Sequence, residues 1–410
     1  MKVLVFGGTG KIGAAVAWDL AREATVETVG LVARSKAALE RTKRWIGSPK
    51  IRLHQVDASG PEAQRAMAEY DVGVIALPDR RTSYKVAHLA IENGLHIVDM
   101  LEEYHRRPDA YETEGLETPP GMSAAEYGEW LHGQAVKNEV TFLDGIGFAP
   151  GLSNITVGEG IRKLDRAESA IARVGGIPAK AAAARHPLRY MVTWAFDHVL
   201  REYMIKVQVI TEGKVVEVDA LTDRERFRFR QFGVDEELEC AITPGMPSFI
   251  YTRPELREFA EKTIRWPGHY QAIDVLKECG LLDLTPVRVG RKEVVPREFL
   301  SHLLTPKLQP GPEDTDVCVM WNTVQGTKGG RRARIDYYLW DEADRETGIS
   351  SMARVTGFAA AIGARFVGAG KIKATGIVAP EDAIAGDLYA EFIAELAKRR
   401  IVVREILSVQ

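Results

Sequence analysis

The chain has 410 residues, 45% hydrophobic and 27% charged, which is the composition of a folded protein of two or three domains. Its net charge of -3 provides no basic field for nucleic acid, and no apolar run reaches the roughly 20 residues that a membrane span needs. The three cysteines lie far apart without a C-x-x-C pair, which argues against disulfides and structural zinc and fits a reducing cytoplasm.

Short apolar segments alternate with amphipathic segments over the first 145 residues. The apolar segments have the composition of strands buried on both faces of a parallel sheet, and the amphipathic segments have helical spacing. The alternation predicts a doubly wound parallel sheet of the Rossmann type. Strands are expected at 2–6, 28–33, 51–57, 72–78, 95–100 and 139–145, and helices at 11–24, 35–46, 61–70, 82–94 and 123–138.

The pattern changes after residue 145. Segment 203–221 predicts a β-hairpin, because apolar residues alternate on both sides of a turn at Glu212-Gly213. A further strand is expected at 333–342, followed by a small-residue helix at 352–367. The middle of the chain therefore has the pattern of a mixed sheet with added helices, which is an α+β arrangement.

These patterns predict two domains. Residues 1–145 are expected to form a dinucleotide-binding Rossmann domain, and residues 146–350 a substrate domain with a mixed sheet. The last segment, 351–410, resembles the first domain in composition and is expected to pack back on it.

A Gly-x-Gly-x-x-Gly motif at residues 8–13 follows the first strand and opens the first helix. In such motifs the first glycine permits a tight turn, the second lets a pyrophosphate approach the backbone, and the third lets helix pack on strand. The N-terminus of the helix favours the phosphate charge. The residues expected to bind the dinucleotide here are Gly8, Thr9, Gly10, Lys11 and Ile12.

The end of the second strand indicates the type of dinucleotide. An NAD site usually has an acidic residue there for the ribose hydroxyls, whereas this chain has Arg34 and Ser35. A cation beside a hydroxyl suits a 2′-phosphate, so we expect NADP, with NAD and a solvated Arg-Lys pair as the alternatives. Asp57 ends the third strand and is expected near the adenine or as the cap of the helix that starts at Pro61.

Two further strands end at the expected ligand crevice, because ligands bind outside the carboxyl ends of parallel strands. Leu77 and Pro78 end the fourth strand and are expected beside the nicotinamide. Asp99 ends the fifth strand and is the carboxylate expected to bind a substrate amine or move its proton, a helix cap or loop carboxylate being the alternative. Polar residues at 102–105 follow closely and share this candidacy.

Several common catalytic motifs are missing from the sequence. No Tyr is followed four residues later by Lys, no cysteine stands in a recognisable nucleophile setting, and neither H-E-x-x-H nor G-x-S-x-G occurs. We therefore expect no metal and a hydride-transfer reaction that relies on placement and an acid–base group.

Three stretches resemble the saccharopine dehydrogenase-like family: GIGFAPGLSNI at 145–155, KTIRWPGH at 262–269 and MARVTGFAAAIGA at 352–364, with VGGIPA between them. Their order and spacing match across nearly the full length, and the likeness is closest to the lysine 6-dehydrogenases. The resemblance implies an NAD(P)-dependent oxidoreductase acting on the C–N bond of a small amino-acid or opine substrate. It also implies a homodimer and a middle domain that serves substrate binding and dimerisation.

The stretch KTIRWPGH combines a Pro-Gly turn with Arg265, a fixed cation whose donors suit a carboxylate. An exposed turn with a solvated arginine is the alternative from the residues alone. The resemblance assigns Thr263 and Arg265 to a substrate carboxylate and Arg253 to a second one. It assigns His269 to proton transfer.

Two family markers disagree in this chain. Glutamate-forming saccharopine reductases carry Asp in G-L-D-P-G, where this chain has Ala149, as lysine 6-dehydrogenases do. Lysine 6-dehydrogenases carry an acidic residue where this chain has Arg34. We expect oxidative deamination of the lysine ε-amine to the semialdehyde or cyclic imine, with Asp99 or His269 taking the amine proton. A saccharopine-type or carboxynorspermidine-type enzyme and a non-catalytic nucleotide-binding sensor are the alternatives.

Overall fold

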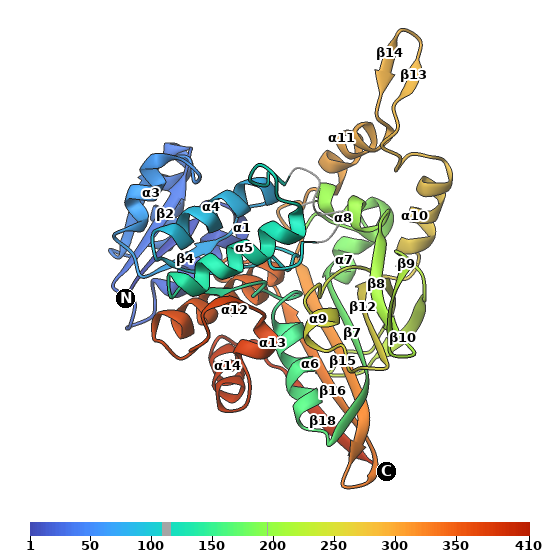
Figure 1. Cartoon of the computed structure of the whole chain (residues 1–410). Helices are drawn as coiled ribbons and strands as arrows, with labels where there is room; N and C mark the ends of the chain where they lie inside the picture. The colour runs from blue at the N-terminus through green and yellow to red at the C-terminus, as the bar shows by residue number, and fades with distance from the viewer. Residues whose placement is uncertain (109–115, 195) are drawn as a thin grey trace. The chain divides into compact units, whose positions relative to one another are not determined.

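The computed structural model describes residues 1–108, 116–194 and 196–410, which form two compact units (Figure 1). The first, called here the Rossmann unit, comprises residues 1–163, 246–253 and 353–402. The second, the mixed-sheet unit, comprises residues 164–245, 254–352 and 403–410. The domain boundaries drawn from the sequence, at 145 and 350, stay a prediction.

The Rossmann unit is built on a parallel sheet with the strand order β17-β6-β5-β4-β1-β2-β3. The expected doubly wound parallel sheet is confirmed. Because β1 lies between β2 and β4, the strand order reverses direction there and opens the ligand crevice of such sheets. The strands are β1 (Lys2–Phe6), β2 (Thr28–Ala33), β3 (Ile51–Gln55), β4 (Val72–Ile75), β5 (His96–Asp99), β6 (Thr141–Leu143) and β17 (Gly376–Val378).

Helices cover this sheet, and side-chain caps define where several of them begin. Ser35 caps α2, Asp79 caps α4, and Ser123 with Glu126 forms a capping box on α5. The five helices expected in this region are present: four are shorter than expected by one to four residues, and α4 has the expected length but begins and ends two residues earlier. The helices of the unit are α1 (Lys11–Leu20), α2 (Lys36–Ile46), α3 (Pro61–Met67), α4 (Arg80–Glu92), α5 (Ala124–Lys137), α6 (Leu152–Arg162), α9 (Phe249–Thr252), α12 (Ser351–Gly368), α13 (Pro380–Ala383) and α14 (Asp387–Lys398).

The mixed-sheet unit contains a sheet with the order β10-β11-β12-β7-β15-β16-β18, on which β8 pairs with β12 and β9. Strand β12 runs parallel to β7, and the other pairs are antiparallel, so the expected mixed sheet is confirmed. The strands are β7 (Arg166–Pro178), β8 (Lys206–Thr211), β9 (Lys214–Asp219), β10 (Glu225–Phe229), β11 (Glu236–Ile242), β12 (Glu258–Arg265), β15 (Asp316–Lys328), β16 (Arg331–Glu342) and β18 (Arg404–Val409).

The expected hairpin of this unit is formed by β8 and β9, with Glu212 and Gly213 in the turn at φ 53° and 76°. A second hairpin, made of β13 (Val287–Val289) and β14 (Lys292–Val294), projects near α11 (Figure 1). The helices are α7 (Lys180–Ala183), the 3-10 turn η1 (Pro187–Arg189), α8 (Phe196–Glu202), α10 (His269–Glu278) and α11 (Pro296–Leu308). None of the helices in the described residues is long and apolar enough to cross a membrane.

The C-terminal segment is divided between the two units. Residues 353–402, which carry most of α12 together with α13 and α14, belong to the Rossmann unit. Gly357 lets α12 approach α1 closely, since a Cβ at Gly357 would lie 3.2 Å from the carbonyl oxygen of Ile12. Strand β18 instead pairs antiparallel with β16 in the mixed sheet.

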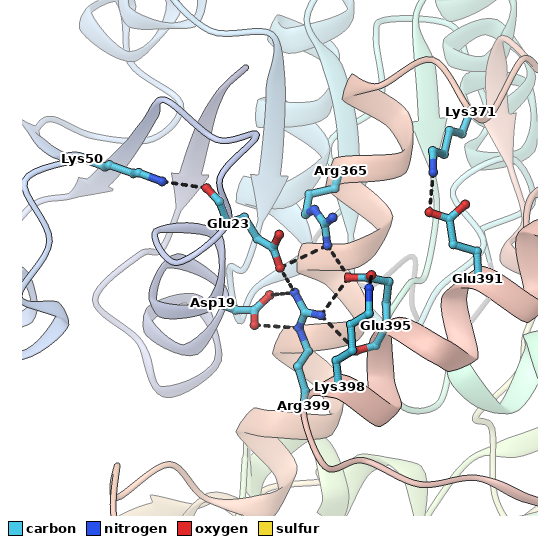
Figure 2. Close-up of polar contacts among 9 residues, drawn as sticks. All are labelled: Asp19, Glu23, Lys50, Arg365, Lys371, Glu391, Glu395, Lys398 and Arg399. Atoms are coloured by element: carbon cyan, nitrogen blue, oxygen red, sulfur yellow. Dashed lines mark hydrogen bonds and ion pairs between the residues drawn. The ribbon is translucent and has the colours of Figure 1, made fainter.

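A network of ion pairs ties the C-terminal helices to α1 within the Rossmann unit (Figure 2). Arg399 donates to both carboxylate oxygens of Asp19, at 2.7 and 2.9 Å, and to Oε2 of Glu395 at 3.0 Å. Arg365 joins the network through Glu395 at 2.6 Å and Glu23 at 3.2 Å. Burial disfavours the charge of Glu395, but hydrogen bonds from three cations lower the pKa of this carboxyl to about 2.

Candidate active site

The glycine-rich loop between β1 and α1 has the geometry of a phosphate-binding turn. Gly7 has φ 76°, and a Cβ there would lie 2.3 Å from the carbonyl oxygen of Ala76, so only glycine fits. A Cβ on Gly13 would lie 2.4 Å from the Gly7 oxygen. Gly10 is the N-cap of α1 and supplies no side-chain cap, so the N–H groups of the first turn are left to bind a phosphate.

The tight turn that the motif places at Gly8 lies one residue earlier, at Gly7. The signal in the sequence was the doubled glycine that precedes Thr9. Gly8 is constrained differently, because a Cβ there would lie 2.9 Å from Cδ2 of Leu31 on the neighbouring strand β2. Gly7, Gly8, Gly10 and Gly13 therefore act together to bring the loop and the helix against the sheet.

Arg34, Ser35 and Asp57 lie near the ends of β2 and β3. Arg34 is exposed and is close enough to Asp57 to help lower the pKa of that carboxyl, although hydrogen bonds from Ser59 are the larger cause. Ser35 accepts from the N–H of Ala38 at 3.2 Å and caps α2. Asp57 accepts from the N–H and hydroxyl of Ser59, at 3.0 and 2.8 Å, while Gly60 is the N-cap of α3.

Leu77 and Pro78 follow β4, on the other side of the point where the strand order reverses. The Leu77 side chain is partly buried beside Gly7, and Pro78 is exposed just before the α4 cap Asp79. The structure therefore brings Leu77 against the glycine-rich loop, whereas Pro78 is exposed.

Asp99 is fully buried at the end of β5. Its Oδ1 accepts from the N–H groups of Gly145 and Leu101, at 3.1 and 3.3 Å, and its Oδ2 lies 3.8 Å from Nε2 of His105. The other ring nitrogen of His105 lies 2.7 Å from Oδ1 of Asp144. The structure thus joins Asp99 to Asp144, a residue that the sequence did not single out because 45 positions separate them.

Burial dominates the electrostatics of this trio. Burial raises the pKa of Asp99. Burial alone would lower the pKa of His105, but the facing Asp144 and Asp99 raise it. Ligand atoms of the three side chains lie within 4.8 Å of one another, the spacing of a metal site. Both Asp144 oxygens, however, already engage the ring and the N–H of His105, so a protonated His105 accounts for the arrangement without a metal.

Arg265 ends β12 and is 4% exposed, so it is not the solvated arginine of an exposed turn. Its Nε donates to the Tyr203 hydroxyl at 3.1 Å and its Nη1 to the Ile264 carbonyl oxygen at 3.0 Å. The guanidinium also lies 5.4 Å from the centre of the Tyr190 ring. Within the described part of the chain, no carboxylate forms an ion pair with Arg265.

His269 begins α10 directly after Gly268, whose φ is 95°. Its Nδ1 lies 2.8 Å from the Leu188 carbonyl oxygen and its Nε2 lies 3.0 Å from the Tyr203 hydroxyl. A carbonyl only accepts, so Nδ1 carries the hydrogen and Nε2 accepts from Tyr203. Burial and the neighbouring Arg265 lower the pKa of His269 to about 3, which keeps the ring neutral. The hydrogen bonds therefore run in one direction from Arg265 through Tyr203 to His269.

Thr263 lies between two buried charged residues, because Glu261, Thr263 and Arg265 share one face of β12. The Thr243 hydroxyl donates to Oε2 of Glu261 at 2.8 Å and lies 2.6 Å from the Thr263 hydroxyl. Glu261 could have been found from the sequence, because it stands two and four residues before Thr263 and Arg265 and therefore shares their face of a strand.

Arg253 lies in the Rossmann unit, whereas Arg265 lies in the mixed-sheet unit. The Arg253 guanidinium donates to the Thr252 carbonyl oxygen at 2.6 Å, the Glu381 carbonyl oxygen at 3.2 Å and Oδ1 of Asp382 at 2.7 Å. Its donors are thus engaged by the protein, and its assignment to a substrate carboxylate stays a prediction.

Comparisons with known proteins cover nearly the whole chain. The model of the saccharopine dehydrogenase NADP binding domain matches residues 3–142, and that of the saccharopine dehydrogenase C-terminal domain matches residues 147–402. A carboxyaminopropylagmatine dehydrogenase from Synechocystis sp. is 21% identical over 399 residues, which are 93% of this chain and 92% of that protein. The apo saccharopine dehydrogenase (L-Glu forming) from Saccharomyces cerevisiae superposes with a TM-score of 0.76, at 20% identity over 99% of each chain.

Proposed function

Because the chain belongs to the saccharopine dehydrogenase family, we propose that this NAD(P)-binding oxidoreductase acts on the C–N bond of a carboxylate-bearing amine, an amino acid or an opine. Arg265 carries the proposal: it is a buried guanidinium that finds no carboxylate partner among the described residues. A buried charge is costly unless an opposite charge compensates it. A substrate carboxylate, bound by the free side of the guanidinium fork, supplies that compensation.

We place an opine-type reaction first, in which the reacting nitrogen joins two carbon chains. The Synechocystis relative, which is matched over 93% of this chain, is named for agmatine bearing a carboxyaminopropyl group, and the structural neighbour is named for saccharopine. In the oxidative direction, a hydride leaves the carbon attached to nitrogen, and water splits the imine into an aldehyde and an amine. When bound, the nicotinamide of the dinucleotide accepts that hydride.

The residues of the chain place the substrate and handle its proton. Arg265 holds the carboxylate, and Tyr203 with His269 fixes the orientation of the guanidinium. The position of the reacting carbon is therefore fixed for hydride transfer. Both ring nitrogens of His269 are engaged, which gives this residue an orienting role. We retain Asp99, linked to His105, as the group that takes or returns the proton.

Oxidation of the lysine ε-amine is the second candidate, and Ala149 is the residue that favours it. This position carries Asp in the glutamate-forming saccharopine reductases that the chain resembles. Such a reaction needs one carboxylate site, which Arg265 provides, and no site for a second carbon chain. The homodimer expected from the sequence stays a prediction in either case.

We propose NADP as the dinucleotide because Arg34 stands exposed beside Asp57, where a 2′-phosphate would bind. Arg34→Ala is expected to raise the KM for NADP about tenfold, roughly 1.4 kcal/mol, and to leave the KM for NAD unchanged. Equal changes for both dinucleotides would assign Arg34 to a feature that they share.

The reaction is tested by absorbance at 340 nm with NADP or NAD and a panel of lysine, ornithine, saccharopine and N-carboxyalkyl diamines. Turnover of at least one opine without turnover of lysine supports the first candidate, and turnover of lysine alone supports the second. Dinucleotide binding without turnover of any panel member contradicts both and favours a non-catalytic nucleotide sensor.

A further inference from the structure

We propose that Glu261 determines substrate specificity by binding a cationic end, an ammonium or a guanidinium, of the same substrate whose carboxylate Arg265 binds. The inference rests on the proposed function and names the substrate class for that site. One strand, β12, carries both of these buried charges of opposite sign.

Glu261 and Arg265 are four residues apart on β12, so their side chains leave the same face of the sheet. A strand rises about 3.3 Å per residue, which separates the two Cα atoms by about 13 Å. Thr263 stands between them on that face and is only partly buried, whereas both charged residues are buried. Solvent therefore reaches this row at its middle.

The carboxyl of Glu261 has no ion-pair partner among the described residues, and Arg265 acts on it only through its charge. It is 4% exposed, and across residues 1–108, 116–194 and 196–410 its one side-chain hydrogen bond comes from the neutral hydroxyl of Thr243. No lysine, arginine or histidine in that part of the chain forms an ion pair with it. Gly245 lets the carboxyl lie where it does, because a Cβ at Gly245 would come within 2.5 Å of Cδ of Glu261.

The nearest cation along the strand does not neutralise Glu261. Lys262 is the next residue, so its side chain leaves the opposite face of β12. There its Nζ contacts Oδ2 of Asp223 at 2.6 Å and also pairs with Glu225. The lysine is therefore fully paired by acids of its own face.

Burial and the neighbouring charges act on the pKa of Glu261. Burial raises the pKa of Glu261 well above its ordinary value and the charge of Glu202 raises it further, whereas the hydrogen bond from Thr243 and the charge of Arg265 lower it. A buried carboxyl whose pKa is raised keeps its proton unless a cation takes the place of that proton. A substrate ammonium or guanidinium replaces that proton with two or more directed hydrogen bonds.

The two charges on β12 together describe an ampholytic substrate. Its carboxylate lies at Arg265, its cation lies on the order of 10 Å away at Glu261, and the reacting C–N bond lies between them. A diamine or guanidino-amine chain fits this pattern. A second carboxylate in place of the cation would face Glu261 and be repelled.

The test is a comparison of amines in the reductive direction, with NADPH, aspartate semialdehyde and either agmatine, putrescine, n-butylamine or glutamate. The wild type is expected to use agmatine or putrescine with at least tenfold higher kcat/KM than n-butylamine or glutamate. Glu261→Gln keeps the shape and removes the charge. It is expected to lower kcat/KM for the cationic amine at least tenfold, mainly through KM, and to leave n-butylamine unchanged.

Glu258→Gln is the matched control, since Glu258 lies on the same strand but is partly exposed and accepts from the N–H of Glu212 at 3.0 Å. It is expected to keep the wild-type amine preference. Unchanged dinucleotide affinity and Tm show that Glu261→Gln folds. Equal losses for agmatine and n-butylamine, or a wild type without preference, overturn the inference.

Calorimetric binding of agmatine and n-butylamine to the protein saturated with NADP separates this inference from the proposed function. Tighter binding of agmatine that disappears in Glu261→Gln supports the cation site even if no amine is turned over, an outcome that contradicts the proposed reaction alone. Equal binding of both amines by the wild type overturns the cation site whatever the turnover.

Discussion

The two units of the chain treat their buried arginines differently. In the Rossmann unit, Arg399 is paired with Asp19 and Glu395, and Arg80 is paired with Glu103, which also accepts from the Tyr84 hydroxyl at 2.7 Å. In the mixed-sheet unit, Arg265 is 4% exposed, less than either of these, but has a tyrosine hydroxyl, a backbone carbonyl and an aromatic face in place of a carboxylate.

The difference separates structural charges from functional ones. A buried cation with its own carboxylates contributes to folding, because removing it leaves those acids uncompensated. A buried cation without one opposes folding until a ligand supplies the anion. Substitution of a paired arginine should therefore lower stability more than activity, and substitution of the unpaired Arg265 should lower activity more than stability.

The largest effect is expected for Arg399→Met, which leaves the buried Asp19 without its bidentate partner and removes one of the three cations that pair with Glu395 (Figure 2). The free energy of unfolding of the Rossmann unit, measured in urea, should fall by about 3–5 kcal/mol, and the KM for the substrate should not change. Lys371→Met is the control, because the Lys371–Glu391 pair has both side chains about 40% exposed. In this control variant the free energy of unfolding should fall by less than about 1 kcal/mol. Equal losses in the two variants would contradict the structural role of Arg399.

Arg265→Met should show the opposite pattern. The KM for the carboxylate-bearing substrate is expected to rise at least tenfold, about 1.4 kcal/mol or more, because the anion loses its bidentate partner. The Tm should stay the same or rise, since an apolar side chain of similar length replaces an uncompensated buried charge. Steady-state kinetics and thermal melts check both parts. An unchanged KM for every substrate turned over would remove Arg265 from the site.

Tyr203→Phe sharpens the comparison, because it disturbs the unpaired arginine without removing it. Arg265 loses the acceptor at its Nε, and His269 loses the donor at its Nε2. KM should rise about fivefold, roughly 1 kcal/mol, with kcat retained. The pH profile of kcat should not move, because His269 is neutral over the working range. A shift in that profile would indicate that His269 titrates during catalysis.

The smallest effect is the acid dependence of the paired network. The folded-state pKa of Glu395 is about 2, below the ordinary value of 4.5 for a glutamate, so the native state binds fewer protons than the unfolded state. Its contribution to stability is complete above about pH 5 and is lost as pH falls from about 4.5 to about 2. Urea unfolding at a series of acidic pH values measures the free energy of unfolding against pH. This free energy should fall with decreasing pH in the wild type and should fall less steeply in Arg399→Met.

Much of the fold could be predicted because its signals are local. The strands of the parallel sheet are short apolar runs, and the Glu212-Gly213 turn stands between two alternating segments. The glycine-rich loop is recognised from spacing alone, although spacing did not reveal that Gly7 adopts the left-handed backbone. That detail depends on the approach of the Ala76 carbonyl, which follows β4 and which no local pattern encodes.

The candidate site could be predicted only in part. The resemblance selected Thr263, Arg265 and His269, which are near one another in the chain. It did not select Tyr203, which joins the last two, or Glu261, whose proposed role depends on its burial and on the charges near it.

The sequence by itself determined the parallel sheet, the dinucleotide loop and the cation in KTIRWPGH, because periodicity, glycine spacing and residue chemistry are properties of neighbouring residues. Only the tertiary structure decided which charges are paired. Arg253 pairs with Asp382, more than a hundred residues away in the chain, whereas Arg265 contacts tyrosines in place of an acid. Compensation of a buried charge depends on contacts across the fold, so the distinction between a structural and a substrate-binding arginine becomes visible only once the chain is folded.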